Sequence, residues 1–310
     1  MIVPLKPARR ATDRGKTGKQ SRIEAYCFFL FITPWAVGFL AFALFPILAS
    51  FYYSLTVFDA IRAPKWIGVG NYVELAHDPL FWQSLKVTAT YAVGSVSLGI
   101  AASMAIALLL NRNIHGLAVF RTIFYLPAVI SGVAVSLLWK WIFQPEFGVL
   151  NNLIWTLFHI KGPNWLGREQ WVMPAMIVMS LWGIGGGIVI YLARLQGIPT
   201  ELYEAAEIDG AGTWARILRI TVPLMTPVIF FNLIMGIIGS FQVFTQAYVM
   251  TNGGPNNASL FYVLYLYNNA FRYYRMGYAS ALAWILFLIL IALTLMVFRT
   301  ASRWVYYETS

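Results

Sequence analysis

Charged residues are scarce in this chain: Asp, Glu, Lys and Arg make up 11% of its 310 residues, whereas 59% of the residues are apolar. A water-soluble domain of this composition could not cover its core with polar surface. The shortage of charge therefore excludes a soluble protein and predicts an integral membrane protein.

Cysteine and histidine are scarce as well. The single cysteine, Cys27, excludes a disulfide framework and a cysteine-based metal site, and we interpret it as a small apolar filler in or beside the first apolar run. The three histidines, His77, His115 and His159, fall on different loops without partners at ligand spacing. They are typical of solvated loop residues, and we expect no metal site.

Signatures of catalysis are also missing. The Gly15-Lys16-Thr17 triplet resembles the end of a phosphate-binding loop, but Arg10 occupies the position of the required earlier glycine and no strand precedes it. The apolar runs contain no carboxylate pair for an intramembrane hydrolase and no ionisable relay for an ion-coupled carrier. We therefore expect a non-catalytic chain that binds no cofactor and no ATP itself.

What the chain does have is six apolar runs of the length that a helix needs to cross a membrane, which is about 20 residues. The pattern predicts an all-α integral membrane fold with six transmembrane helices. Pro34 and Pro46 interrupt the first run, between Glu24 and Asp59, so we expect its helix to occupy only part of it. The other runs cover residues 87–110, 120–143, 171–193, 224–248 and 279–298.

The basic residues predict the orientation. Seven Lys and Arg residues lie in the first 24 residues, and with six spans 14 of the 22 fall on the same side as that tail. The positive-inside rule places this side, with both termini, in the cytoplasm. The predicted organisation is a basic tail (1–24), a six-span domain (25–304) and a C-terminal tail (305–310). The net charge of +10 needs no nucleic-acid partner, because the tail and anionic lipid explain it.

A polar insert, residues 199–223, separates the fourth and fifth runs on the cytoplasmic side. Thr200 can cap a helix over residues 201–208, whose first turn holds acidic residues near the positive end of the helix dipole. The glycines of residues 209–212 predict a tight turn with positive φ, and Thr213 can cap a second helix that ends against Pro223. The insert should form a helix-turn-helix.

The insert has the surface of a docking element. Ala205 and Ala206 leave a smooth patch, and Tyr203, Ile208 and Trp214 offer apolar knobs that a mere connection would not need. A helix lying in the lipid head groups is the alternative. The four carboxylates of the insert count against it, because interfacial helices usually present Lys and Arg.

The spacing within the insert carries a resemblance. Glu204-Ala205-Ala206, then Gly210, then Ile220, Val222 and Pro223 resemble the EAA signature of permease subunits of ATP-binding-cassette importers, with Val222 in place of the usual leucine. Three further stretches resemble the carbohydrate branch of that family, which includes permeases for maltose, lactose and glycerol-3-phosphate. They are the residues flanking the signature, Trp141 to Asn151, and Asn252 to Pro255.

The resemblance, which runs from about Tyr26 to the C-terminus, implies a prokaryotic plasma (inner) membrane subunit whose insert couples it to a cytoplasmic ATPase. It implies coupling roles for these residues: Glu204, Ala205, Ala206, Asp209, Gly210, Trp214 and Pro223. It also implies three kinds of partner: a second permease, two ATPase subunits that bind the ATP, and an extracytoplasmic solute-binding protein docked on outer loops 140–168 and 251–276. A heterodimer is expected, and a homodimer stays open.

A polar stripe in the fifth run predicts the solute pathway. Asn232, Met235, Gly239, Gln242 and Gln246 fall within roughly 80° of one another on a helix. Neutral amides suit sugar hydroxyls, although the same amides could instead tie helices together. Tyr91, Trp182 and Phe241 are weaker aromatic candidates, and the glycines at 183 and 185–187 predict close helix packing or a flexible point.

The leading hypothesis is thus a permease subunit that moves a sugar or sugar derivative into the cytoplasm. The alternative is a membrane scaffold or receptor component that recruits a cytoplasmic partner through residues 199–223 without moving solute. The sequence does not identify the sugar.

Overall fold

The computed structural model describes residues 18–111 and 116–306 of the chain. Residues 1–17 of the predicted basic tail, with the Gly15-Lys16-Thr17 triplet, lie outside this part, as do His115 and residues 307–310 of the predicted C-terminal tail. The chain divides into two compact units, Met1–Tyr52 and Tyr53–Ser310.

The described part of the first unit is helical through Pro34 and Pro46. α1 (Gly18–Phe39) continues through a π-helical segment, η1 (Leu40–Leu44), into α2 (Phe45–Ser54), so that 33 residues from Arg22 to Ser54 form one candidate span. The helix covers only part of the run between Glu24 and Asp59, as expected, but it ends at Ser54 and not at either proline. The π-helical segment η1 ends two residues before Pro46, and local π-helical adjustments of this kind help to pair the carbonyl groups that a proline leaves without an N–H partner.

Three further helices are long and apolar enough to cross a membrane. They are α4 (Pro79–Leu110), the continuous run Thr213–Phe241, and α14 (Met276–Ala301). The run Thr213–Phe241 comprises α11 (Thr213–Arg216), the π-helical η3 (Ile217–Thr221) and α12 (Val222–Phe241). The described residues therefore hold four candidate spans, or up to six if each of two bent helix pairs forms one span.

Two bent helix pairs correspond to the predicted third and fourth spans, residues 120–143 and 171–193. α5 (Leu117–Val129) and α6 (Gly132–Ile142) meet at 102°, where Ile130 and Ser131 adopt extended ψ angles of 140° and 134°. α8 (Glu169–Ser180) passes through a 3₁₀ turn, η2 (Leu181–Gly183), into α9 (Gly185–Gln196) with a bend of 49°. Hydropathy counts apolar residues along the chain, but it does not sense such backbone breaks.

Short elements connect these helices. Two antiparallel strands, β1 (Thr56–Val57) and β2 (Lys65–Trp66), pair Thr56 with Trp66 and Val57 with Lys65, a small departure from the predicted all-α fold. The remaining elements are α3 (Gly70–His77), α7 (Val149–Phe158), α10 (Thr200–Ile208), the π-helical η4 (Ala247–Thr251), α13 (Tyr262–Tyr267) and the π-helical η5 (Asn268–Arg272).

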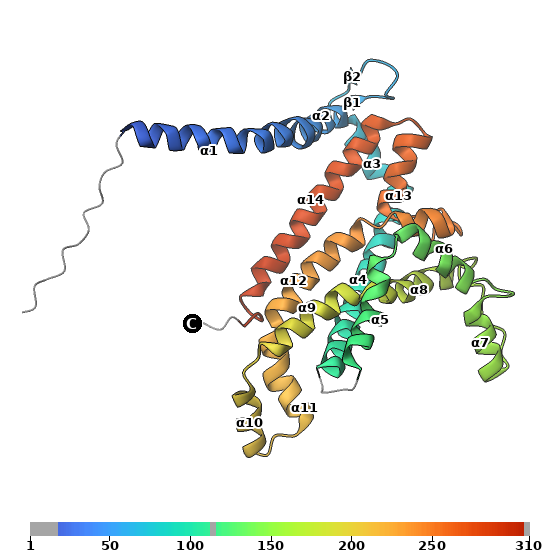
Figure 1. Cartoon of the computed structure of the whole chain (residues 1–310). Coiled ribbons are helices and arrows are strands. Elements are labelled where there is room, and N and C mark those ends of the chain that lie inside the picture. Colours follow the sequence, from blue (N-terminus) through green and yellow to red (C-terminus); the bar gives the residue numbers. More distant parts are fainter. Residues whose placement is uncertain (1–17, 112–115, 307–310) are drawn as a thin grey trace, which may run out of the picture. The chain divides into compact units, whose positions relative to one another are not determined.

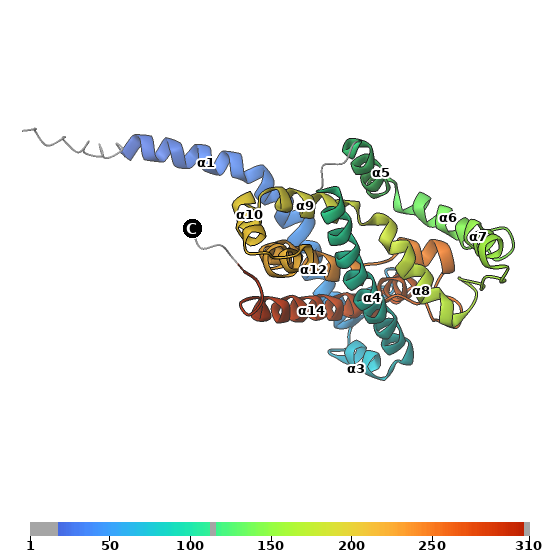
Figure 2. The ribbon, with the colours of Figure 1, turned by 90° about the horizontal axis from the view of Figure 1, so that it is seen from below.

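In the unit Tyr53–Ser310, α10 and α11 lie at one end, whereas α3, β1 and β2 lie at the opposite end (Figure 1). α4 occupies the middle, where it contacts α8, α9, α12 and α13 (Figure 2). Two apolar clusters form the core. One joins α4, α8, α13 and α14, and the other joins the C-terminal half of α4 to α9 and the start of α12.

Candidate functional site

A cavity of about 550 Å³ opens among α4, α5, α8, α9 and α12. Its size is that of a small-molecule site. Its polar wall consists of hydroxyl and amide side chains, namely Tyr91, Ser95, Ser103, Ser180, Tyr191, Asn232, Ser240 and Gln246. No Asp, Glu, Lys or Arg is among the described residues that line it. The wall can exchange hydrogen bonds with a neutral polar solute without offering a charge.

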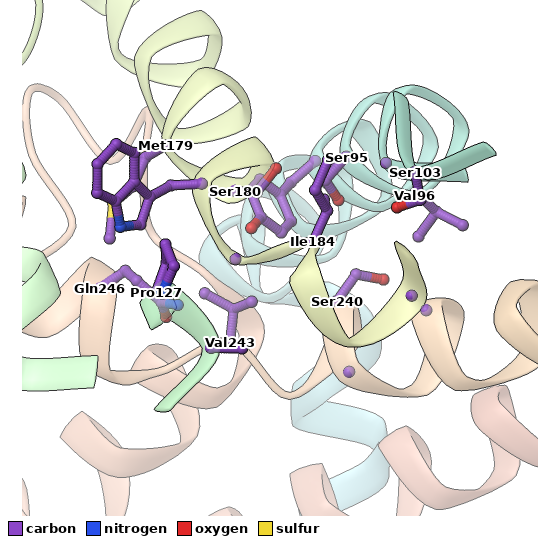
Figure 3. Close-up of a pocket in the computed structure, with 18 of the residues that line it drawn as sticks. Ser95, Val96, Ser103, Pro127, Met179, Ser180, Ile184, Ser240, Val243 and Gln246 are labelled. Atoms are coloured by element: carbon purple, nitrogen blue, oxygen red, sulfur yellow. The ribbon is translucent and has the colours of Figure 1, made fainter. Parts of the chain in front are cut away.

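The polar groups come from several helices. Figure 3 shows Gln246 and Met179 toward one end of the cavity and Ser103 toward the other, with Ser180 and Ser95 between them. Gly187 lies where α9 comes close to α4 and α12, since a Cβ atom there would lie in a tight contact of 3.1 Å with Ser103 Oγ and in ordinary contact, at 3.6 Å, with Asn232 Oδ1. Glycine thus lets α9 bring hydroxyl and amide groups of α4 and α12 together.

Four of the five residues of the predicted stripe line this cavity, namely Asn232, Met235, Gly239 and Gln246. Gln242 does not, because α12 ends at Phe241 and the chain leaves helical geometry before Gln246. The predicted fifth helix (224–248) is therefore too long. The stripe that placed Gln242 beside Gln246 assumed that helix.

The alternative role for the amides, a hydrogen bond that ties two helices together, is not what the Asn232 amide group forms through its nitrogen. Its Nδ2 donates to the Val228 carbonyl oxygen, one turn earlier in α12, at 2.9 Å. That bond fixes the side chain on its own helix and does not tie α12 to another helix. It leaves Oδ1 as an acceptor beside Gly187, next to Ser103 Oγ.

Of the aromatic candidates, Tyr91 and Trp182 line the cavity, whereas Phe241 belongs to the apolar core. Tyr91 meets Phe261 edge to face at 5.1 Å, and Trp182 meets Trp139 in the same way at 5.9 Å. These pairs fix the ring orientations in the wall.

Sequence reasoning missed Tyr191, which lines the cavity from α9 and is 0% exposed. Its hydroxyl has no hydrogen-bond partner among the described residues, although buried hydroxyls are normally paired. A tyrosine within an apolar run has no local signal that separates a cavity wall from ordinary packing.

The insert begins with α10, and its turn contains Gly210 at φ +76°, which confirms the predicted positive φ. Thr200 and Thr213 are not caps: they are the first residues of α10 and α11, and Pro199 and Gly212 hold the cap positions without side-chain bonds. Each helix therefore begins at its threonine, one residue earlier than predicted, and the preceding residue with extended ψ takes the cap position.

The proposed contact residues of the insert differ in exposure. Ile208 and Trp214 are 87% and 77% exposed, and Glu204, Ala205 and Asp209 are also exposed, whereas Ala206 is half-buried. Tyr203 is not an exposed knob, because it packs on the apolar cluster of α4, α9 and α12, and its hydroxyl shares a 3.0 Å hydrogen bond with Thr221 Oγ1.

Two contacts stiffen the turn between α10 and α11. Arg216 forms an ion pair with Glu207, with 3.1 Å between Nη1 and Oε2, and the Ala211 N–H donates to the Ala206 carbonyl at 2.8 Å. Pro223 does not end the second helix as predicted, since it lies in the first turn of α12 directly after η3. The end of the insert is thereby continuous with α12, one wall of the cavity.

The histidines carry no metal site among the residues that the structure describes. His77 Nδ1 lies 2.9 Å from the Val73 carbonyl oxygen in α3, and His159 is exposed at the end of α7. Cys27 is exposed on α1 and forms no disulfide.

A neutral polar cavity between apolar helices, together with an exposed helical insert, is the arrangement of a membrane permease. Comparison with known proteins gives its family. The chain belongs to the family described as binding-protein-dependent transport system inner membrane component, whose pattern matches residues 95–304. The resemblance carried by the EAA spacing is confirmed, and the fold is that of a transport permease component.

Relatives extend over nearly the whole chain. It is 41% identical to the probable ABC transporter permease protein YesP of Bacillus subtilis (strain 168), over 96% of this chain and 97% of YesP. It is 36% identical to the lactose transport system permease protein LacF of Rhizobium radiobacter, over 88% of this chain and 93% of LacF.

The fold also matches a solved structure. A bacterial ABC transporter involved in the import of the acidic polysaccharide alginate superimposes with a TM-score of 0.80 at 25% identity, covering 92% of this chain and 98% of that one.

Proposed function

We propose that this chain is the membrane permease subunit of an ATP-binding-cassette importer that admits a sugar or sugar derivative to the cytoplasm. The observation that carries the proposal is one cavity with a neutral, hydroxyl- and amide-rich wall, linked by packed helices to an exposed helical hairpin. The lactose and alginate functions of the relatives named above support a carbohydrate solute.

The proposed pathway runs along the cavity. Asn232, Gly239 and Gln246 would face the solute, and the unpartnered hydroxyl of Tyr191 is a further donor for it. Gln242 remains in the proposal as an exposed amide just beyond α12, where a second permease could complete the pathway.

The proposed coupling element is the insert 199–223, with Glu204, Ala205, Ala206, Asp209, Gly210, Trp214 and Pro223 as its functional residues. Its exposed apolar side chains, Ile208 and Trp214, would gain from burial in a protein groove, and its exposed carboxylates could pair there with basic side chains. Its base is anchored through Tyr203 in the cluster that also contains Tyr191 of the cavity wall. A displacement of the hairpin would thus reach the cavity through packed side chains.

The proposed assembly pairs this subunit with a homologous permease, two cytoplasmic ATPases that bind the ATP, and an extracytoplasmic solute-binding protein. The chain would carry no catalytic site and no cofactor of its own. The domain boundaries, six spans and cytoplasmic termini stay as predicted, with each bent pair counted as one span. Docking of the binding protein on loops 140–168 and 251–276 is consistent with the 2.5 Å bond from Asn256 Nδ2 to Glu169 Oε1, which braces the second loop against α8.

The coupling proposal is tested at the turn of the insert. Gly210→Val forces a β-branched residue into positive φ, at a cost of at least about 1 kcal/mol, and should abolish uptake in vesicles containing the assembled transporter. Gly212→Ala is the matched control, because Gly212 has φ −66° and open space where a Cβ would lie. Glu204→Lys, on the exposed face of α10, should also abolish uptake and release or uncouple the ATPase.

The two variants Gly210→Val and Glu204→Lys should be present in the membrane in the same amount as the unaltered chain. Normal uptake in Gly210→Val and Glu204→Lys would contradict the coupling role. A wild-type assembly that recruits an ATPase but accumulates no solute would favour the scaffold alternative.

A further inference from the structure

α7 is apolar but too short to span a membrane. Its ten residues extend about 15 Å, half of a hydrocarbon core of about 30 Å. It connects the two bent pairs, and both views place it at the edge of its unit, beyond α6 and α8 (Figures 1 and 2). Neither the cavity nor the insert involves it.

One side of α7 is fixed to the protein by Asn151, which is only 7% exposed. Asn151 Nδ2 donates to the carbonyl oxygens of Pro145 at 3.0 Å and Pro163 at 3.2 Å, and its Oδ1 accepts from Trp165 Nε1 at 2.7 Å. A Cβ at Gly162 would lie 2.0 Å from Oδ1, so glycine is required beside the anchor. The rotation of α7 about its own axis is thereby set.

Two stripes remain exposed once this side is fixed, besides the apolar side chains of Trp155 and Phe158. Val149, Leu153 and Leu157 recur every four residues and form an apolar stripe, with Leu157 61% exposed. Asn152 and Thr156 form a polar stripe about 80° around the helix from it, and both are exposed. Adjacent apolar and polar stripes on a short helix are typical of a helix lying along a membrane surface.

We propose that the Val149–Leu153–Leu157 stripe lies against lipid at the boundary between acyl chains and head groups, with Asn152 and Thr156 facing water. α7 would thus be a surface anchor on the side of the membrane where α8 begins. The apolar surface of α6, which exposes Val133 and Leu137, precedes it in the chain and continues toward the same lipid.

The composition of α7 favours lipid over a second protein. The helix contains no charged residue, the exposed indole of Trp155 suits the head-group region, and Lys161 follows three residues after its end. The exposed Asn152 and Thr156 stay available to a solute-binding protein docked on loop 140–168, so a lipid contact of the apolar stripe is compatible with the docking proposed above.

The test places a nitroxide label on each stripe of the full chain in its assembled transporter. Cys27 is the only cysteine, so Cys27→Ser gives a background for Leu157→Cys and, as the matched control one residue away, Thr156→Cys. Spin-label accessibility to oxygen, which concentrates in lipid, and to a water-soluble nickel chelate is measured in phosphatidylcholine–phosphatidylglycerol nanodiscs.

We expect the label at 157 to collide with oxygen and to lose contact with the chelate, and the label at 156 to show the reverse preference. Chelate access at 157 would overturn the proposal, because the stripe would then face water. Protection of 157 from both reagents would also overturn it, because protein would then cover the stripe. The measurement needs no transport activity, so it stands apart from the function proposed above.

Discussion

At the scale of single residues, Asp78 joins more elements than its place in a loop suggests. Its Oδ1 accepts from the Leu80 N–H at 2.8 Å and caps α4, while its Oδ2 accepts from the hydroxyls of Tyr265 in α13 and Tyr278 in α14. Burial opposes ionisation, but these hydrogen bonds outweigh it and hold the pKa of Asp78 below its ordinary value. The sequence shows Asp78 before Pro79 as a recognisable helix start. It does not show the tyrosine partners of Asp78, because they lie nearly 200 positions away in the chain.

The first prediction concerns acid stability through Asp78. Because its folded pKa is lowered, the carboxylate contributes stability above its unfolded pKa of about 3.9, and this is lost as pH falls through the folded pKa. Tyr265→Phe removes one donor and moves the folded pKa upward. We expect thermal unfolding of the purified protein to show a loss of about 1 kcal/mol near pH 7 that shrinks as the pH is lowered toward 3.

The exposed Tyr273 supplies the control, because Tyr273→Phe removes a hydroxyl from the same region without touching Asp78. Equal stability profiles for the two variants would refute the role of the Asp78 cluster.

Other features of single residues could be predicted only where a local rule determines them. The positive φ of Gly210 follows from a local rule and could be predicted. The caps at Thr200 and Thr213 could not, because capping depends on which residue is the first to leave helical backbone geometry. Pro199, at ψ 130°, and Gly212, at ψ 165°, already occupy that position.

At the scale of elements, the glycines of α9 illustrate close packing. A Cβ at Gly185 would lie 2.2 Å from the Phe124 carbonyl oxygen of α5, whereas a Cβ at the neighbouring Gly186 would meet nothing within 4 Å. The sequence predicted either close packing or a flexible point for this cluster. The structure assigns close packing to Gly185 and a bend to the 3₁₀ turn just before it.

The second prediction follows from that contrast. Gly185→Ala should force α5 and α9 apart at a cost of about 1 to 3 kcal/mol, because backbone is the clashing neighbour and cannot rotate away. Gly186→Ala should be tolerated. Thermal unfolding of the purified protein and the yield of assembled transporter would measure both, and equal behaviour of the two variants would contradict the packing.

Element boundaries show where hydropathy fails. The apolar runs located the membrane helices, since apolar length is a property of the sequence alone. The 102° bend of α5 and α6, the end of α12 at Phe241 and the continuous helix through Pro34 depend on which backbone groups find partners.

At the scale of the whole molecule, the cavity lies within the unit that also holds the insert. The third prediction concerns its polar wall. Asn232→Leu and Gln246→Leu should each lower the uptake efficiency of the assembled transporter by roughly tenfold, because each removes a partner for a solute hydroxyl. Uptake of labelled sugar at several concentrations, with assembly checked separately, measures this effect.

Met235→Leu is the control for that prediction, since Met235 lines the same cavity and the change conserves both volume and polarity. If uptake is unchanged in the two amide variants, or is reduced equally in the control, then the amides of the cavity wall do not contact the solute.

The sequence by itself determined that this protein is a helical membrane protein of the binding-protein-dependent permease family, because hydropathy and the spacing of the EAA signature are local properties. Only the tertiary structure decided that Asn232 and Gln246 share a cavity with Tyr191 while Gln242 does not, and that Tyr203 anchors the insert. Those facts depend on where helices bend and end, which is settled by backbone hydrogen bonding and packing between segments far apart in the chain.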